Sequence, residues 1–135
     1  HMKYWLLKTE PNTFSWQVLK ERKSEPWDGV RNYQARNYMR EISVGDFCFI
    51  YHSGEEKQIV GLAKCVKSNY PDPTAPGEAW VCIDLAFEKD LKRPLTLKEL
   101  KEDPFFIDLP LIKHTRLSVM PVPDFIYERI IQLVG

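Results

Sequence analysis

The hydrophobic and polar residues of this chain alternate in short runs, and most of the apolar runs predict β-strands. Continuous or alternating apolar residues predict strands at 3–8, 47–51, 59–66 and 80–88, and residues 116–120 have the composition of a last strand. The polar residues 53–57 separate the second run from the third, which predicts a hairpin. In the fourth run the apolar side chains alternate, so one face of that strand is expected to point into the core.

Two short helices are predicted between the first strand and the second. Phe14, Val18 and Leu19 recur at helical spacing, and Thr13 can cap the helix that carries them. Residues 34–41 predict another helix, whose arginines and asparagine face outward.

Two more helices are predicted in the last third of the chain. Residues 96–99 have a capping-box pattern and begin a helix that Asp103-Pro104 ends. Pro123 and Asp124 suit the first turn of a C-terminal helix. The expected buried stripe of that helix consists of Ile126, Ile130 and Leu133. Short strands with helices early and late predict an α+β fold built on a small curved sheet or barrel.

Two segments rich in proline and glycine are predicted to be loops. Pro26 and Gly29 interrupt residues 25–32, a segment that presents a tryptophan and an asparagine. Residues 69–77 contain three prolines, which predicts an ordered loop rather than a strand. Long loops beside short strands often line binding sites, so both segments are candidates for function.

The composition fits one globular domain. The chain has 135 residues, of which 44% are hydrophobic and 28% charged, and no internal repeat or low-complexity tract divides it. No apolar run approaches the roughly 20 residues of a membrane-spanning helix, and no secretory signal opens the chain. We therefore expect no membrane partner, a location inside the cell and a single domain over residues 3–135, preceded by His1-Met2 as an expression remnant.

The charge balance excludes a protein that binds nucleic acid through net charge alone. Nineteen basic residues match nineteen acidic ones, so any contact with a polyanion must be local. Residues 1–67 hold eleven Lys or Arg and eight acidic residues, whereas residues 68–135 hold eight and eleven. An anionic ligand is accordingly expected on the first half, where Arg31, Arg36 and Arg40 are candidate phosphate ligands.

The cysteines and histidines suggest neither a metal site nor a disulfide. The three cysteines lie in apolar runs and form no C-x-x-C pair: Cys48, Cys65 and Cys82. We expect them to be small core side chains. Once His1 is set aside, only two histidines remain as further ligands. The sequence therefore predicts no bound metal and no cofactor.

The aromatic residues suggest a binding site for a planar ligand. There are seventeen of them, and two tryptophans fall outside the predicted strands. Trp16 lies at a predicted helix start, and Trp27 lies in the loop 25–32, where we expect its indole face to stay open. A nucleobase is bound by a flat apolar wall with donors and acceptors at its edge. The loop supplies such a set in Trp27, Gly29, Val30 and Asn32.

The ends of two predicted strands are candidates to complete the same pocket. Lys8 and Thr9 end the first strand, and His52 and Ser53 end the second. The run Lys8-Thr9-Glu10 also permits an enzyme, since a threonine activated by lysine can attack an amide. In a strand, however, Thr9 points away from both of its neighbours, so an amidohydrolase is the alternative rather than the first hypothesis.

Six ordered segments resemble the EVE domain family. They are Tyr4–Pro11, Phe14–Trp16, Trp27–Asn37, Tyr51–Ser53, Tyr70–Thr74 and Arg116–Val119. The resemblance covers nearly the whole chain and implies a PUA-like fold, a curved mixed sheet or pseudo-barrel of five to six strands with short flanking helices. The family is related to YTH domains, which read modified RNA.

By analogy with the aromatic cage of YTH domains, the resemblance implies a pocket for a modified base. Carried over by motif, Trp27 is the stacking wall, and Gly29 and Val30 read the base through their backbone. Asn32 reads the base edge, and Lys8 and Thr9 close another side of the pocket.

The leading hypothesis is a non-catalytic reader that binds a modified nucleobase in DNA or RNA. Its expected partner is a nucleic acid that carries a base similar to 5-methylcytosine or 6-methyladenine. The protein is expected to be a monomer. The alternatives are a small amidohydrolase acting on a modified nucleoside and a protein-interaction domain. Residues 75–79 form a shorter tract than we expect of the family, and no basic extension precedes the domain. The missing extension favours a stand-alone bacterial protein in the cytoplasm, whereas a eukaryotic one is expected in the nucleus.

Overall fold

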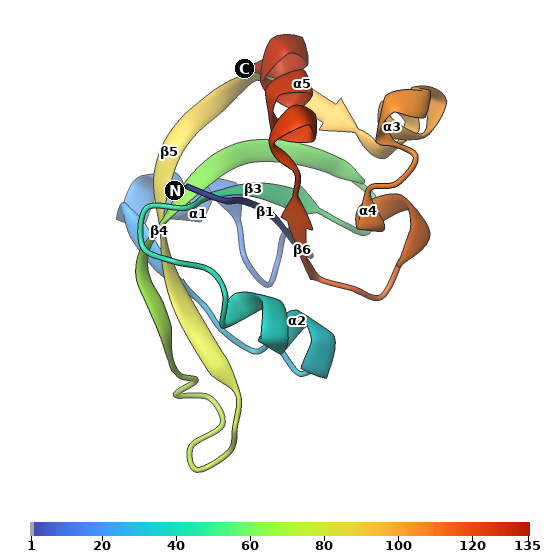
Figure 1. The fold of residues 1–135 in the computed structure, drawn as a ribbon. Coiled ribbons are helices and arrows are strands. Elements are labelled where there is room, and N and C mark those ends of the chain that lie inside the picture. Colours follow the sequence, from blue (N-terminus) through green and yellow to red (C-terminus); the bar gives the residue numbers. More distant parts are fainter. Residues whose placement is uncertain (1) are drawn as a thin grey trace.

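The computed structural model describes residues 2–135 and contains one six-stranded mixed sheet (Figure 1). Its strands are β1 (Tyr4–Thr9), β2 (Ser24–Trp27), β3 (Phe47–His52), β4 (Gln58–Pro71), β5 (Val81–Thr96) and β6 (Val119–Val122). They lie in the order β2-β5-β4-β3-β1-β6, and every neighbouring pair is antiparallel except β1 with β3. The sheet is open, because β2 and β6 are its two edges. The predicted α+β class, the strand number and the hairpin of β3 with β4 are confirmed.

Helices cover both faces of this sheet. They are α1 (Trp16–Arg22), α2 (Tyr33–Met39), α3 (Leu97–Glu102), the 3-10 turn η1 (Pro104–Phe106), α4 (Pro110–Lys113) and α5 (Asp124–Val134). Tyr127 of α5 stacks on Tyr4 of β1 with ring centroids 3.7 Å apart, while Tyr38 of α2 lies 6.3 Å from Trp5. Successive strand residues point to opposite faces, so α5 and α2 lie on opposite sides of β1.

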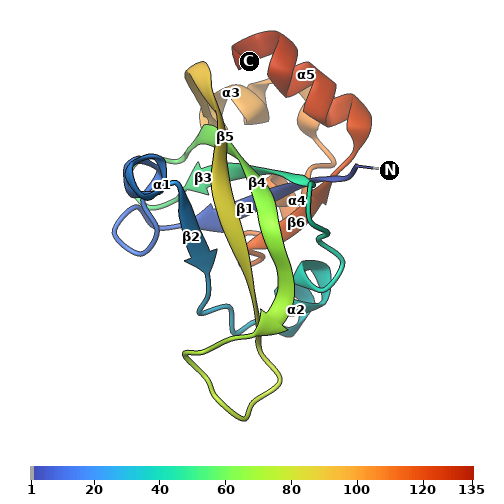
Figure 2. The ribbon, with the colours of Figure 1, turned by 90° about the vertical axis from the view of Figure 1, so that its left-hand side faces the viewer.

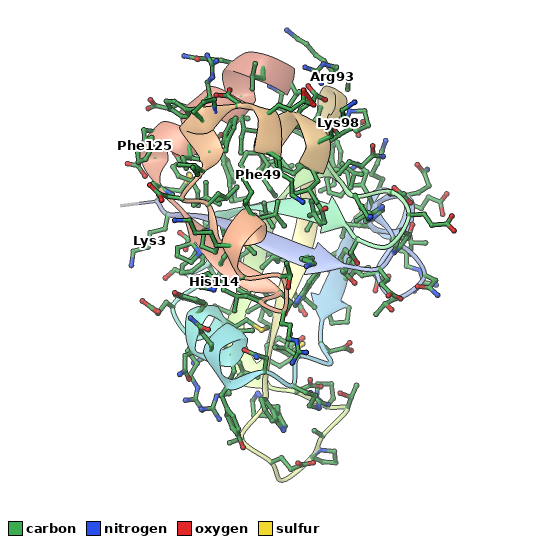
Figure 3. The ribbon with its side chains drawn as sticks, turned by 90° about the vertical axis from the view of Figure 1, so that its right-hand side faces the viewer. Lys3, Phe49, Arg93, Lys98, His114 and Phe125 are labelled. Atoms are coloured by element: carbon green, nitrogen blue, oxygen red, sulfur yellow. The ribbon has the colours of Figure 1, made fainter. Side chains whose placement is uncertain are left out.

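The core is centred on β1 and β3, which are buried on both faces. Leu6, Leu7, Phe49 and Ile50 are fully buried, which explains why these strands are continuous apolar runs rather than alternating ones. Figure 3 shows Phe49 between the sheet and the C-terminal helices.

The three cysteines are free and buried, as predicted for small core side chains. Burial raises the pKa of Cys65 and of Cys82 to about 11 and raises that of Cys48 well above its usual value. All three are therefore thiols at neutral pH, which is the unreactive form.

The first helix begins later than predicted. Its N-cap is Ser15, whose Oγ accepts the backbone N–H of Val18 at 3.4 Å, and not Thr13. The N–H of Thr13 instead donates to the carbonyl of Glu10 at 3.0 Å, because the chain makes a turn before the helix can start. Residues 11–15 are thus an ordered connection beside the end of β1.

The prediction of one loop over residues 25–32 is wrong for its first part, because Ser24–Trp27 form the edge strand β2. This strand pairs with β5, and Pro26 lies opposite Asp84. Proline is tolerated because an edge strand has one side without ladder partners. The strands β4 and β5 are also longer than predicted, so the connecting loop is confined to residues 72–80.

The C-terminal predictions hold for α3, whose capping box of Thr96 and Glu99 is present, and for the end of α3 at Asp103. The buried stripe of α5 is Ile126, Ile130 and Val134, whereas Leu133 is half-buried. The segments η1 and α4 were not predicted, since three or four residues are too few to show a helical period.

Candidate functional site

A cavity of about 600 Å³ lies at the carboxyl end of β1. It is lined by the end of β1, by residues 11–15, by Val18 and Arg22 of α1, by residues 25–32 and by Ser118. Figure 2 shows α1 and β2 beside the end of β1, so segments from the start of the chain enclose the cavity. Its volume is within the range of about 300–1,000 Å³ that is typical of small-molecule sites.

Two aromatic side chains form the apolar wall of this cavity. The rings of Trp27 and Phe14 lie with centroids 4.8 Å apart and planes inclined by 55°. Trp27 is only 5% exposed, so the expectation of an indole face open to solvent is wrong, although the residue still lines the cavity. The cause is β2, which pairs Trp27 with Ile83 of β5 and draws the indole into the core.

A buried carboxylate holds the turn that follows Trp27. Asp72, which is 1% exposed, accepts the N–H of Gly29 at 2.8 Å and Nη1 of Arg31 at 3.0 Å, both on Oδ2. Its Oδ1 accepts the backbone N–H of Thr74 at 2.8 Å and the Thr74 hydroxyl at 2.6 Å. Gly29 has φ of 75°, a left-handed conformation that glycine adopts without steric cost. Asp72 therefore ties the β4–β5 loop to the wall of the cavity.

The same network fixes the charge of Asp72. Burial alone would raise its pKa, but the hydrogen bonds from Thr74, Gly29 and Arg31 outweigh this effect and lower the pKa to about 2. At the cavity rim, partial burial and then the negative charge of Asp72 raise the pKa of Asp28. The ionised Asp72 thus acts as a fixed anchor for Gly29 and Arg31.

Lys8 and Thr9 both line the cavity, but they do not contact each other through a hydrogen bond. The Lys8 ammonium group donates to the carbonyl of Thr115 at 2.6 Å, and the Thr9 hydroxyl donates to the carbonyl of Glu10 at 3.3 Å. Burial lowers the pKa of Lys8. The ammonium group is therefore held at the cavity edge by the segment before β6.

The expected edge and backbone readers lie in the cavity wall, yet part of their hydrogen-bonding capacity is already used. Asn32 is the N-cap of α2, and its Oδ1 accepts the N–H of Ala35 at 2.9 Å. The N–H of Gly29 is bound by Asp72, and the carbonyl of Val30 accepts Nη1 of Arg31 at 3.0 Å. The side-chain NH2 group of Asn32 therefore remains to donate to a ligand.

Trp16, His52 and Ser53 are placed together, but outside the cavity lining. The Trp16 ring covers Gly61 so closely that a Cβ there would lie 2.1 Å from it, and its indole N–H donates to Asp90 at 3.2 Å. His52 Nε2 accepts the backbone N–H of Trp16 at 3.4 Å. These contacts fix the start of α1, whose Val18 lines the cavity, against the sheet.

The three candidate phosphate ligands occupy different places. Arg31 lines the cavity and is paired with Asp72. Arg36 lies next to the aromatic rings of Tyr33 and Trp80, outside the lining. Arg40 is exposed at the C-cap of α2, and the structure does not bring it to the cavity.

Residues 2–135, the part that the structure describes, bear on the expectations about metal ions and membranes. In this range no three His, Cys, Asp or Glu side chains are grouped so that they could hold a metal ion. Nor does any helix there have the length and apolar character needed to cross a membrane.

Sequence reasoning missed Phe14 and Ser118, which line the cavity, and Asp72, which supports it through Gly29 and Arg31. The Pro-Asp-Pro-Thr motif did indicate a turn in which aspartate bonds the backbone two residues on. Its other partners, Gly29 and Arg31, are 43 and 41 residues away in the sequence, and no local pattern predicts such contacts.

Comparison with known proteins agrees with the motifs. The sequence profile of the EVE domain matches residues 3–133. The chain belongs to the EVE domain family. Its open six-stranded sheet has the PUA-like architecture that the resemblance implies.

Relatives of this EVE domain occur in bacteria and vertebrates. Thymocyte nuclear protein 1 of Danio rerio is 36% identical over 163 aligned residues, which cover 96% of this chain and 71% of the relative. A protein of Agrobacterium tumefaciens has a crystal structure with a TM-score of 0.93 and 40% identity, covering 97% of this chain and 92% of that one. The human THYN1 protein, in a crystal structure with DNA containing 5-methylcytosine, has a TM-score of 0.90 and 32% identity, covering 97% and 96% of the two chains.

Proposed function

We propose that this EVE domain binds a modified base of DNA in the cavity beside Trp27, with 5-methylcytosine as the first candidate. The observation that carries the proposal is the human THYN1 structure, which contains 5-methylcytosine DNA and matches 97% of this chain with a TM-score of 0.90. The cavity of about 600 Å³ supplies a site of suitable size for one base.

The chemistry of the cavity suits a base that has left the helical stack. Trp27 and Phe14 offer aromatic and apolar surface, and the side chains of Thr9 and Asn32 offer polar groups around it. A methyl group buried against such a wall gains about 0.8 kcal/mol, which corresponds to a preference of about fourfold over the unmodified base. Preference for the methylated base is therefore several-fold rather than absolute.

Each candidate residue has a role in this proposal. Trp27 is the stacking wall, and the Asn32 side-chain NH2 group donates to the base edge. The backbone of Gly29 and Val30, whose N–H and carbonyl are hydrogen-bonded to Asp72 and Arg31, forms the wall beside the base. Lys8 and Thr9 close the side next to β6. Trp16, His52 and Ser53 act indirectly, since they position α1 and the end of β1. In a bacterium this reader acts in the cytoplasm, and in a eukaryote in the nucleus.

The geometry of Lys8 and Thr9 favours a reader over an amidohydrolase. A nucleophilic threonine needs a base within hydrogen-bonding reach of its hydroxyl. Here the Lys8 ammonium group donates to Thr115 and the Thr9 hydroxyl to Glu10. Incubation with acylated nucleosides tests this directly, and we expect no released product.

The test of the proposed function is a binding titration with matched labelled oligonucleotides. Four probes share one sequence and carry a single 5-methylcytosine, a cytosine or a 6-methyladenine in DNA, or a 5-methylcytosine in RNA. We expect the 5-methylcytosine DNA to bind several-fold more tightly than its unmodified counterpart, to one protein monomer. Equal binding of all four probes, or no binding of DNA, would overturn the proposal.

A further inference from the structure

Next to the cavity, two aromatic rings and two arginines form a layered cluster that we call the Tyr33–Trp80 stack, after its rings. The two ring centroids are 5.0 Å apart with planes inclined by 26°. The guanidinium carbon of Arg31 lies 5.6 Å from the Trp80 ring, and that of Arg36 lies 5.0 Å from the Tyr33 ring and 5.7 Å from the Trp80 ring. Of these four residues only Arg31 lines the cavity.

Tyr33 is far more exposed than packing requires. It is 67% exposed, the largest value for any large hydrophobic side chain described between residues 2 and 135. Trp80 stacks on its ring and the Arg36 guanidinium carbon lies 5.0 Å from its centroid, yet at 67% exposure most of the ring surface stays open to solvent. An open aromatic face backed by a second ring is the kind of platform on which proteins stack nucleobases.

Arg31 connects this stack to the cavity. Its guanidinium group is held by Asp72 at 3.0 Å and by the Thr74 hydroxyl at 2.8 Å while it lies over Trp80. The two surfaces are therefore neighbours with fixed relative positions, separated by one anchored side chain. A nucleic-acid strand that places one base in the cavity therefore brings its neighbouring nucleotides to the stack.

Arg36 supplies positive charge at the same place. Its guanidinium group donates to the carbonyl of Ala79 at 3.4 Å and to Oδ1 of Asn37 at 3.3 Å, and neither acceptor is charged. In contrast, the charge of Arg31 is already balanced by the ionised Asp72. The charge of Arg36 is thus available to a phosphate.

We propose that the open face of Tyr33 stacks a nucleobase next to the one held in the cavity, while Arg36 contacts the phosphate between them. This inference rests on the proposed function, which it extends from one base to a short stretch of the strand. Stacking is independent of sequence because every base has a π-face. The stack therefore supplies affinity for any DNA strand, and the cavity supplies the preference for the modified base.

Substitutions at Tyr33 test the inference with three probes. These are free 5-methyl-2′-deoxycytidine, a short single-stranded oligonucleotide with one 5-methylcytosine, and the same oligonucleotide with cytosine. We expect Tyr33→Ala to weaken the binding of both oligonucleotides by the same factor, about 5- to 150-fold, and to leave the affinity for the nucleoside unchanged. Tyr33→Phe, which keeps the ring, is expected to bind like the wild type.

Phe125→Ala provides a matched control, since Phe125 is a 57% exposed aromatic residue on α5, at the opposite end of the molecule from α2 (Figures 1 and 3). It should leave all three affinities unchanged. Arg36→Gln should make the log–log salt slope of oligonucleotide binding shallower by about 0.7, the value for one lost phosphate contact on a single strand.

The possible failures are distinguishable. If the wild type prefers the methylated oligonucleotide and Tyr33→Ala binds it equally well, the stack inference is wrong and the proposed function stands. If Tyr33→Ala weakens the free nucleoside as much as the oligonucleotides, Tyr33 acts by shaping the cavity, and the inference is also wrong. If the wild type binds no DNA, the proposed function itself fails.

Discussion

The cavity wall at Trp27 and the Tyr33–Trp80 stack lie on either side of Arg31, yet their aromatic residues are used in opposite ways. Trp27 is 5% exposed and is packed against Phe14, whereas Tyr33 is 67% exposed over Trp80. An enclosed wall can discriminate between bases by shape and by small differences in burial. An open ring can stack any base. Under the proposed function, the cavity supplies selectivity for the modified base and the stack supplies general affinity.

One buried carboxylate serves both regions. Asp72 holds the Gly29 turn of the cavity and, through Arg31, the arginine that lies over Trp80. Because a single residue fixes both surfaces, they are preorganised relative to each other before a ligand arrives, which reduces the entropy lost on binding.

The largest expected effect comes from removing the buried wall. Trp27→Ala should lower the free energy of unfolding by about 3–5 kcal/mol, since it empties a large core site. Trp27→Leu fills more of that volume but removes the flat ring. This variant should stay folded and bind methylated DNA about 5- to 150-fold more weakly than the wild type. Chemical denaturation and oligonucleotide titration give the two readouts.

Trp16→Leu is the control for this comparison, because Trp16 is equally a buried tryptophan but does not line the cavity. It should lose stability without losing affinity in the folded protein. If both leucine variants bind methylated DNA like the wild type, Trp27 is only a core residue.

The pH dependence of stability tests whether Asp72 is the anchor. Its folded pKa of about 2 is below the usual 3.8, so its contribution is present above pH 4 and is lost as the pH falls towards 2. The Asp72→Asn variant has no carboxylate at this position to protonate. The pH effects of the other carboxylates are the same in both proteins, so they cancel when the two free energies of unfolding are subtracted. The stability gap between the wild type and the variant should narrow by about 1 kcal/mol between pH 6 and pH 3. A gap that stays constant in urea denaturation would exclude the anchor role.

A smaller effect separates the arginines. With zero net charge and two to four local phosphate contacts, the log–log salt slope of single-strand binding should be about −1.5 to −3. Arg40→Gln should leave that slope unchanged, because Arg40 lies at the far end of α2 from the cavity. If Arg40→Gln instead makes the slope shallower by the value for one phosphate contact, the surface that contacts nucleic acid extends along α2 to Arg40. A slope near zero for the wild type would point to a free nucleoside as the ligand.

The sequence was sufficient for the family, the strand-rich α+β class and the segment that carries Trp27, because those follow from local motifs and periodicity. It could not reveal that Trp27 is buried, since this depends on pairing with Ile83 in a distant strand. Trp16 and His52 were expected at the cavity, but they contact each other outside its lining. Which side of a strand end faces a pocket is decided by the register of the sheet, and a single sequence does not contain that register.

The Tyr33–Trp80 stack was not predicted for the same reason. Tyr33 begins α2 and Trp80 ends the β4–β5 loop, so only the folded chain brings the two rings together. Asp72 lies within a motif that was recognised, but its long-range partners were not.

The four tryptophans allow the central claim to be measured in one experiment, through the indole N–H signals of ¹⁵N-labelled protein. The indoles of Trp5 and Trp16 donate to Asp46 and Asp90 away from the cavity, so their signals should stay unchanged. Free 5-methyl-2′-deoxycytidine should shift the Trp27 signal alone, and the methylated oligonucleotide should shift both Trp27 and Trp80. A Trp27 signal that does not move at saturating methylated DNA would contradict the account.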